Sequence, residues 1–248
     1  MNSHGGQSFP KRLLVGLLLA AVLIIVVLLA IPALRKSAQR AKSAPEHSQN
    51  ESRSKSEPRM QSSGEQALVQ ETARVSLQRM QEAIDAHRAN AKVLQDSRVM
   101  DMKSVERKDQ LETKREVVRR FLASNDELAA LLANAETAFR QELIKLNVSQ
   151  ATMELALDDF RSRARILEGL ARLRDADKRI ADSMLGVLDM LDENWGRWRY
   201  NKEYDQVQLD WPGALKKYNN FMEEIDSATR DQKEIREQLV NLPNQPHL

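Results

Sequence analysis

The sequence of 248 residues contains no cysteine. This absence excludes disulfide bonds, thiolate metal ligands and a cysteine nucleophile. Histidine, another common metal ligand, occurs four times, and His4, His47 and His247 fall in terminal or linker segments. His87 lies in a helical pattern, but it is not part of a Glu-x-x-His pair of the kind found in carboxylate-bridged di-iron bundles. We therefore expect no metal site and no cofactor.

Glycine and proline are also scarce, with eight and seven residues. Residues 65–168 contain neither, and no proline occurs between Arg59 and Trp211. Because strands need turn residues every few positions, this stretch favours helices over a sheet. The sequence has no glycine-rich phosphate loop and no Gly-x-Ser-x-Gly motif. We therefore expect no nucleotide site and no enzymatic activity.

Aromatic residues make up only 4% of the chain, whereas charged residues make up 30%. Long helices and coiled coils have this kind of composition. Of the 38 basic residues, six flank one apolar segment, and the other 32 stand against 36 acidic residues. A nucleic-acid-binding domain would show a basic excess instead. The composition therefore predicts an all-α chain that does not bind nucleic acid.

The apolar segment covers residues 13–34 and has no charged or polar side chain. As a helix of 22 residues it would be about 33 Å long, enough to cross a hydrocarbon core of about 30 Å. A cleaved signal peptide is the alternative, but its apolar region is usually only about 7–15 residues long. Ile31-Pro32-Ala33 is also a poor cleavage site, because Ile31 is bulky. We therefore predict an uncleaved transmembrane anchor in membrane lipid.

The orientation of this anchor depends on the basic residues at its two ends. By the positive-inside rule, the larger number after the segment favours a cytoplasmic C-terminal side. A short basic N-terminus before a single span is nevertheless the usual form of an anchor with its N-terminus in the cytoplasm. We expect this second orientation, with the bulk of the chain outside the cytoplasm. The basic residues are Lys11 and Arg12 before the segment, and Arg35, Lys36, Arg40 and Lys42 after it.

The remaining boundaries follow from composition. Residues 43–64 contain seven serines, two prolines and one glycine, and they cannot bury enough apolar surface to fold. We expect them to form a flexible tether between the anchor and one helical domain. The predicted segments are a tail at 1–12, the anchor at 13–34, a basic flank and serine-rich linker at 35–64, a helical domain at 65–242 and a tail at 243–248.

Apolar residues in the helical domain recur at alternating spacings of four and three, which is typical of coiled coils. The pattern weakens between Asp96 and Lys108, where we expect a bend. We also expect Ser124 to cap a new helix with Glu127, Ser149 to cap the next one, and the last helix to begin after Trp211-Pro212-Gly213. The expected seams are Ala73, Leu77, Met80, Ile84, His87, Ala91 and Leu94; Leu128, Leu132, Ala135, Phe139, Leu143 and Leu146; Ile166, Leu170, Leu173, Asp177, Ile180, Met184, Val187 and Leu191; and Leu215, Tyr218, Met222, Ile225 and Leu239.

All three tryptophans and all three tyrosines lie between residues 195 and 218, with Arg197, Arg199 and Lys202 among them. One interpretation is a local core where two helices meet, with cation–π contacts from arginine. The other is a binding surface, because Trp, Tyr and Arg dominate interaction hot spots. We expect the helix that follows Ser149 to run from about Gln150 to near Tyr200. Trp195 and Trp198, three residues apart, would then share its apolar face. The candidate partner-binding residues are Trp195, Trp198, Tyr200, Tyr204 and Trp211.

The sequence thus predicts a single-pass membrane protein with a flexible tether and an elongated, coiled-coil-like helical bundle. We expect it to be a structural or interaction protein without catalytic activity, which self-associates or binds a protein partner through its seams. The alternative is a helical-bundle sensor that binds a ligand near residues 195–218. A pocket with convergent polar groups would favour the sensor. Exposed apolar surface over a filled core would favour the interaction protein.

Overall fold

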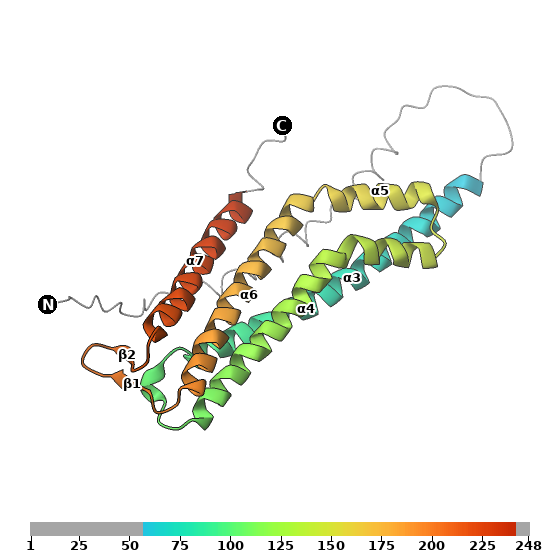
Figure 1. The fold of residues 1–248 in the computed structure, drawn as a ribbon. Helices are drawn as coiled ribbons and strands as arrows, with labels where there is room; N and C mark the ends of the chain where they lie inside the picture. The colour runs from blue at the N-terminus through green and yellow to red at the C-terminus, as the bar shows by residue number, and fades with distance from the viewer. Residues whose placement is uncertain (1–56, 242–248) are drawn as a thin grey trace, which may run out of the picture. The chain divides into compact units, whose positions relative to one another are not determined.

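The computed structural model describes residues 57–241, with their side chains from Gly64 onward except that of Asp159. These residues form a helical bundle, as predicted, with one two-stranded hairpin that the all-α prediction misses (Figure 1). The elements are α3 (Glu57–Asp96), the 3₁₀ turn η1 (Met102–Ser104), α4 (Asp109–Lys145), α5 (Gln150–Arg161), α6 (Ala164–Glu193), β1 (Trp198–Asn201), β2 (Gln206–Leu209) and α7 (Ala214–Asn241).

The predicted membrane anchor lies outside the described residues. Among residues 57–241, no helix has both the length and the apolar composition that a membrane span requires. Helix α3 begins at Glu57, so its first turns occupy the end of the segment that we expected to be a linker. Pro58 stands in the first turn, where it removes no helical hydrogen bond. Outside the described residues lie the tail 1–12, the anchor 13–34, the linker up to residue 56 and the tail 243–248.

The described chain divides into two compact units, and α3 and α4 contribute to both. The main bundle comprises residues 82–133 and 165–241. The small unit comprises residues 57–81 and 134–164. Each unit has its own cluster of buried apolar side chains.

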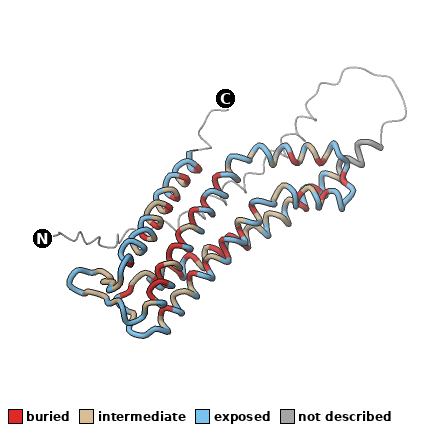
Figure 2. Tube along the Cα trace, viewed as in Figure 1, coloured by how far each residue is buried: buried red, intermediate tan, exposed pale blue. Residues whose placement is uncertain are grey.

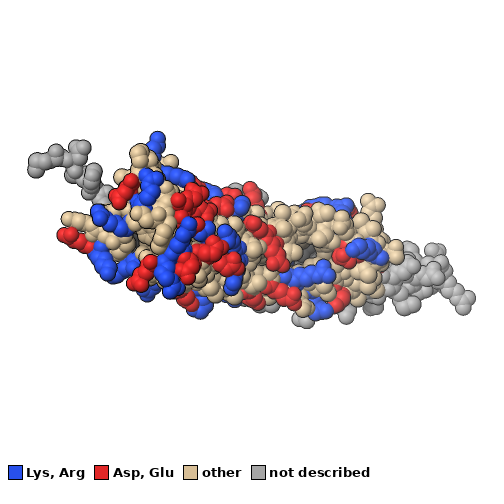
Figure 3. Space-filling view, turned by 60° about the horizontal axis from the view of Figure 1, so that its bottom comes forward, with Lys and Arg blue, Asp and Glu red and all other residues tan. Residues whose placement is uncertain are grey.

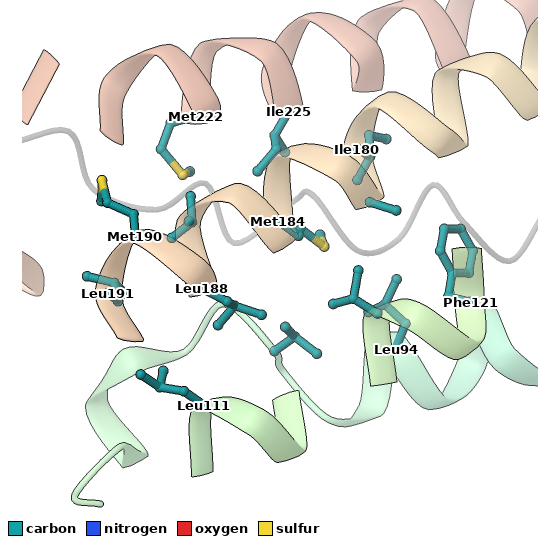
Figure 4. Packing of buried hydrophobic residues seen from close by; sticks show 14 of the residues in the cluster. Leu94, Leu111, Phe121, Ile180, Met184, Leu188, Met190, Leu191, Met222 and Ile225 are labelled. Carbon is teal, nitrogen blue, oxygen red and sulfur yellow. The ribbon is translucent and has the colours of Figure 1, made fainter. Parts of the chain in front are cut away.

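The core of the main bundle is built by α3, α4, α6 and α7. Helix α6 is its central element, and buried positions recur along it (Figure 2). Figure 4 shows Met222 and Ile225 of α7 on one side of α6, and Leu94, Leu111 and Phe121 of α3 and α4 on the other. The predicted seam of α6 is confirmed: its residues are buried from Leu170 to Leu191, and Ile166 is half-buried.

The small unit packs the beginning of α3 against the end of α4 and against α5. Its buried cluster contains Val69, Phe139, Leu143, Val148, Met153 and Leu157. The predicted helix start after Ser149 is confirmed, but the Ser149 side chain does not cap its own helix. Instead the carboxylate of Glu65 accepts hydrogen bonds from the Ser149 amide, the Ser149 hydroxyl and the Thr152 hydroxyl. An acidic side chain of α3 thus accepts from one backbone amide and two hydroxyls at the N-terminus of α5, where a negative charge is favourable.

The predicted helix start at Ser124 is wrong, because α4 runs without a break from Asp109 to Lys145. The Ser124 hydroxyl donates to the carbonyl of Phe121 at 2.8 Å within the helix, and the residue is buried. Since Val118, Phe121 and Leu128 all belong to the buried face of one helix, no cap is needed. In the sequence, Ser124 could not be distinguished from an N-cap residue, although it is a buried polar residue inside a helix.

The predicted helix from Gln150 to Tyr200 is also wrong. It is interrupted between Arg161 and Ala164, and α6 ends at Glu193. The chain then turns at Gly196, whose positive φ of 84° favours glycine. Two residues of the expected seams are not part of the core: Leu146 is 41% exposed and Leu215 is 59% exposed.

Two glycines of α6 allow α7 to approach closely. A Cβ atom at Gly169 would lie 2.6 Å from Cδ2 of Leu239. A Cβ atom at Gly186 would overlap the ring of Phe221. The close approach of α6 and α7 therefore requires glycine at these positions.

We predict that Gly186→Ala destabilises the protein, because the new methyl group forces the Phe221 ring out of place. Such overpacking costs about 1–3 kcal/mol, which exceeds the gain of up to about 1 kcal/mol in helix propensity. Gly64→Ala is the matched control, because nothing lies within 4 Å of a Cβ atom at this helical glycine. Urea unfolding of both variants checks the prediction. Equal gains in stability would contradict it.

Candidate functional site

The predicted aromatic cluster lies on and around the hairpin of the main bundle. Strands β1 and β2 pair antiparallel, with Trp198 opposite Leu209 and Tyr200 opposite Val207. These four side chains are half-buried against the bundle core. The intervening Arg199 bonds Gln208 across the strands, on the alternate face of the hairpin. One face of the hairpin therefore belongs to the core and the other to the surface.

Trp198 fastens the hairpin to the end of α6. Its indole Nε1 donates to the carbonyl of Leu191 at 2.8 Å. Trp195 contacts the Trp198 ring edge-on, with 5.5 Å between the ring centroids, yet it is 37% exposed. The prediction that both rings share a helix face is wrong, because both residues follow the end of α6 at Glu193. Trp195 lies in the turn and Trp198 begins β1.

The tip of the hairpin is held by polar side chains. The Asn201 side chain accepts hydrogen bonds from the amides of Glu203 and Tyr204. The Tyr200 hydroxyl donates to the Asp205 carboxylate. Tyr204, between these anchors, is 61% exposed. A defined turn thus projects an aromatic ring into solvent.

The remaining aromatic residues lie close to the core. Trp211 packs against it, with the Arg197 guanidinium 5.8 Å from its ring centroid. Tyr218 of α7 also packs there, and burial raises the pKa of its hydroxyl to about 12. The structure therefore divides the five candidate residues into two groups. Trp198, Tyr200 and Trp211 pack against the core, whereas Trp195 and Tyr204 are exposed.

A second feature of the main bundle is a layer of buried polar side chains at its centre. We call it the polar layer. All four long helices contribute, and the exposed fractions of its members do not exceed 8%. The members are His87 of α3, Ser124 and Asn125 of α4, Arg174 and Asp177 of α6, and Gln232 of α7.

Asp177 is the centre of the polar layer. Its carboxylate lies 2.8 Å from Nη2 of Arg174 and 3.4 Å from Nε2 of His87. It also accepts a hydrogen bond from the amide of Gln232. A buried carboxylate loses the solvation of water, so it needs such charged and polar donors. One side chain therefore connects α6 with both α3 and α7.

The other members connect the polar layer to α4 and to the outer part of α7. The Asn125 amide donates to the carbonyl of Arg174 at 2.9 Å. The Arg236 guanidinium lies 3.4 Å from the Gln232 side-chain oxygen. Burial lowers the pKa of both Arg174 and Arg236, and the charge of Asp177 opposes this effect. Both side chains are guanidinium cations, because arginine is not deprotonated in proteins at neutral pH.

His87 is the titratable member of the polar layer near neutral pH. Burial lowers the pKa of its imidazole below the ordinary value of 6.5. The hydrogen bond to Asp177 raises this pKa, and the positive charge of Arg174 lowers it. Because the net effect is a lower pKa, His87 is neutral at pH 7.

Ser124, His87 and Asp177 form a chain that resembles a serine-hydrolase triad in composition. The Ser124 hydroxyl oxygen lies 3.5 Å from Nδ1 of His87, whose Nε2 faces Asp177. However, the hydroxyl proton of Ser124 points to the carbonyl of Phe121 and not to the imidazole. All three side chains are buried, so a substrate carbonyl has no access to the serine oxygen. The arrangement joins α3, α4 and α6 and does not suit acyl transfer.

The sequence pattern identified some residues of the polar layer, but it did not predict that they lie together. His87 and Asp177 stand among the expected seam residues, and Ser124 stands as an expected helix cap. Arg174 and Asn125 were missed. Polar residues at seam positions of several helices could have predicted this layer. Such residues are buried together when the helices pack.

Within the described chain, no group of three or more His, Asp or Glu side chains is arranged to hold a metal ion. The sequence matches no protein-family model, no curated protein and no solved structure. Function therefore has to be inferred from the side chains themselves.

We predict that Asp177→Asn strongly destabilises the main bundle, because it leaves the buried Arg174 without a charged partner. Breaking one partner of a buried ion pair costs about 3–5 kcal/mol. Asp182→Asn is the matched control on the same helix, because Asp182 pairs with Lys178 at 3.3 Å on the surface. Its loss should cost at most about 1 kcal/mol. Urea unfolding compares the two, and similar midpoints would contradict the prediction.

Proposed function

We propose that the protein is a single-pass membrane protein whose helical bundle binds a protein partner beside the membrane, without catalytic activity. One observation carries this proposal: the hairpin exposes Trp195 and Tyr204 while Trp198, Tyr200 and Trp211 fasten it to a filled core. Rigidly supported aromatic side chains lose little entropy on binding, and they dominate interaction hot spots.

The charges around the hairpin support a protein as the partner. Residues 195–211 contain three basic and three acidic side chains, so they offer no net charge to a nucleic acid or an anionic membrane. The face of the molecule shown in Figure 3 likewise carries acidic and basic side chains interspersed. The predicted seams pack largely within the chain itself, so the exposed hairpin residues are the better candidates for a partner surface.

The membrane attachment in this proposal rests on the apolar segment 13–34, which is long enough to span a bilayer. The linker that follows tethers the bundle near the membrane, and the coiled-coil-like spacing of four and three continues through its long helices. We propose that the bundle lies outside the cytoplasm.

The sensor alternative has one observation in its favour. Four helices bring charged and polar side chains together in the polar layer, as a sensing site would require. This layer lies on α3, α4, α6 and α7, not at the hairpin where a ligand was expected. The two functions are compatible, because the polar layer and the exposed aromatic residues are different parts of the main bundle.

We predict that Trp195→Ala weakens partner binding with a smaller loss of stability than Trp198→Ala, because Trp195 is partly exposed and makes no backbone bond like that from Trp198 to Leu191. A photo-crosslinking residue at position 204 of the full-length protein in membranes should form adducts with a protein. Trp195→Ala should lower the adduct yield at limiting partner about 30-fold, the effect of a 2 kcal/mol hot spot.

Two controls accompany this experiment. The same crosslinker at Leu155, which is 73% exposed on α5, should give no comparable adduct. Trp198→Ala should lower the melting temperature, because it removes the bond to Leu191 and a half-buried ring. An adduct of twice the chain mass identifies a second copy as the partner. Equal adduct yields at positions 155 and 204 would refute the hairpin surface.

We predict that the bundle is extracytoplasmic, because a short basic N-terminus precedes a single long span. A fluorescent reporter that matures only in the cytoplasm, fused after Leu248, should stay dark. The same reporter fused before Met1 should fluoresce and serves as the control. Fluorescence of the C-terminal fusion alone would reverse the orientation, and release of the protein by alkaline carbonate would refute the anchor.

A further inference from the structure

We propose that the outer edge of strand β2 pairs with the same strand of a second copy of the chain, so that the two hairpins form one continuous sheet. This inference deepens the proposed function and rests on it, because it names the protein that meets the hairpin. Three observations carry it: the hydrogen-bond pattern of the hairpin, the face of the hairpin that the core covers, and the charges of the two strands.

The hydrogen-bond pattern determines which backbone groups point away from the hairpin. The Asp210 amide donates to the carbonyl of Arg197 at 2.9 Å, in the same register as the strand pairs. Hydrogen-bonded and non-hydrogen-bonded pairs alternate along an antiparallel ladder. Counting back from Asp210, the non-hydrogen-bonded positions of β2 are Leu209 and Val207. Their amides and carbonyls therefore point outward, along the free edge of β2.

The outward backbone groups of Val207 and Leu209 have no hydrogen-bond partner among residues 57–241. The core lies against one face of the hairpin, since the alternate apolar side chains of both strands pack on it. The edge of β2 runs beside that contact and not beneath it. The hairpin lies where α6 ends and α7 begins, with its tip directed away from the helices (Figure 1). An unpaired strand edge of this kind is a template for another strand.

The charges of the two strands distinguish their edges. Natural sheets protect an exposed edge with charged side chains or proline. Strand β1 carries the exposed Arg199, whereas β2 reads Gln-Val-Gln-Leu and contains neither a charge nor a proline. Two β1 edges paired about Arg199 would place one guanidinium beside the other, and like charges opposite each other are destabilising. The edge of β2 is therefore the one suited to pairing with itself.

The sequence of β2 also complements itself in one antiparallel register. Val207 of each copy pairs with Leu209 of the other through the outward backbone groups, and the two-fold axis passes between the two Gln208 residues. Val207 and Leu209 then become apolar neighbours on the face that packs against the core. Gln208 lies on the other face, and its side chain has both donors and acceptors for its counterpart. This self-complementarity favours a second copy over an unrelated extended peptide.

The predicted membrane anchor explains how so short a strand can suffice. Two strands of four residues each bury too little surface for a stable dimer in dilute solution. Copies anchored in one membrane meet at a much higher effective concentration. We therefore expect the pairing in the membrane, which is where it has to be tested.

The first test uses disulfide formation at the two-fold axis. The chain has no cysteine, so one substitution provides one thiol per copy. In Gln208→Cys the two Cα atoms of a non-hydrogen-bonded pair should lie about 4.5 Å apart, within the range of a disulfide. Membranes that contain the full-length variant are treated with copper phenanthroline, which oxidises the two thiols. Most of the protein should become a disulfide-linked dimer.

Arg199→Cys is the matched control, because residue 199 lies directly opposite Gln208 in the hairpin and is the more exposed of the two. In the proposed sheet the two copies of residue 199 lie three strand spacings apart, about 14 Å, which is too far for a disulfide. Arg199→Cys should therefore give at least about tenfold less dimer. Equal yields from the two variants, or no dimer from Gln208→Cys, would overturn the proposal.

The second test uses charge and separates this proposal from the proposed function. Gln208→Glu places like charges across the axis, while its carboxylate can still accept from Arg199. A photo-crosslinker at position 204, which the register brings level with residue 212 of the other copy, should then give up to about fivefold less adduct of twice the chain mass. Co-expression with Gln208→Lys should restore this adduct, because opposite charges then meet.

The outcomes of the second test distinguish three cases. An adduct of twice the chain mass that falls and recovers with these charges supports the pairing of β2. An adduct with a different protein would overturn the second copy as partner and leave the partner surface of the hairpin in place. The absence of any adduct in the unsubstituted chain would contradict both the pairing and the proposed function.

Discussion

The buried carboxylate of Asp177 imposes the constraint on which the main bundle depends. A charge in the interior is tolerated only where other groups replace the water that it lost. Arg174 of the same helix, Gln232 of α7 and His87 of α3 provide this replacement. His87 and Gln232 belong to other helices, so each reaches Asp177 in only one register of its helix against α6. The carboxylate therefore selects one arrangement of α3, α6 and α7 from the many that an apolar core would allow.

The layers next to the polar layer show why the register matters. On α6, Leu173 and Ile180 lie about one helical turn before and after Asp177, and both are buried. On α7, Ala228 and Ile235 flank Gln232 in the same way. A shift of α7 by one turn would replace Gln232 beside the carboxylate with Ala228 or Ile235, neither of which can donate a hydrogen bond from its side chain. A single polar position in a helical core is known to specify register for this reason, at a cost in stability.

Spacing made the helices predictable, whereas the polar layer and the hairpin depend on contacts between distant residues. The seam of α6 could be read from the sequence, because burial recurs every three or four residues in a helix. The residues around Ser124 have the sequence pattern of an N-cap. Its contact with His87 in the folded bundle shows that Ser124 is instead a buried residue within α4. The hairpin was missed because Trp198 and Tyr200 alternate over four residues only, too few to distinguish a strand from a helix end. Its position depends on the bond from Trp198 to Leu191.

The contacts of α6 separate the polar layer from the proposed partner surface. Helix α6 is joined to α7 by the close approach at Gly186 and by Arg179, which lies 2.6 Å from both Glu224 and Asp231. Trp198 joins the hairpin to α6. None of these contacts involves α3, and none contains a histidine. The hairpin with Trp195 and Tyr204 is therefore supported from α6 and α7 by contacts outside the polar layer.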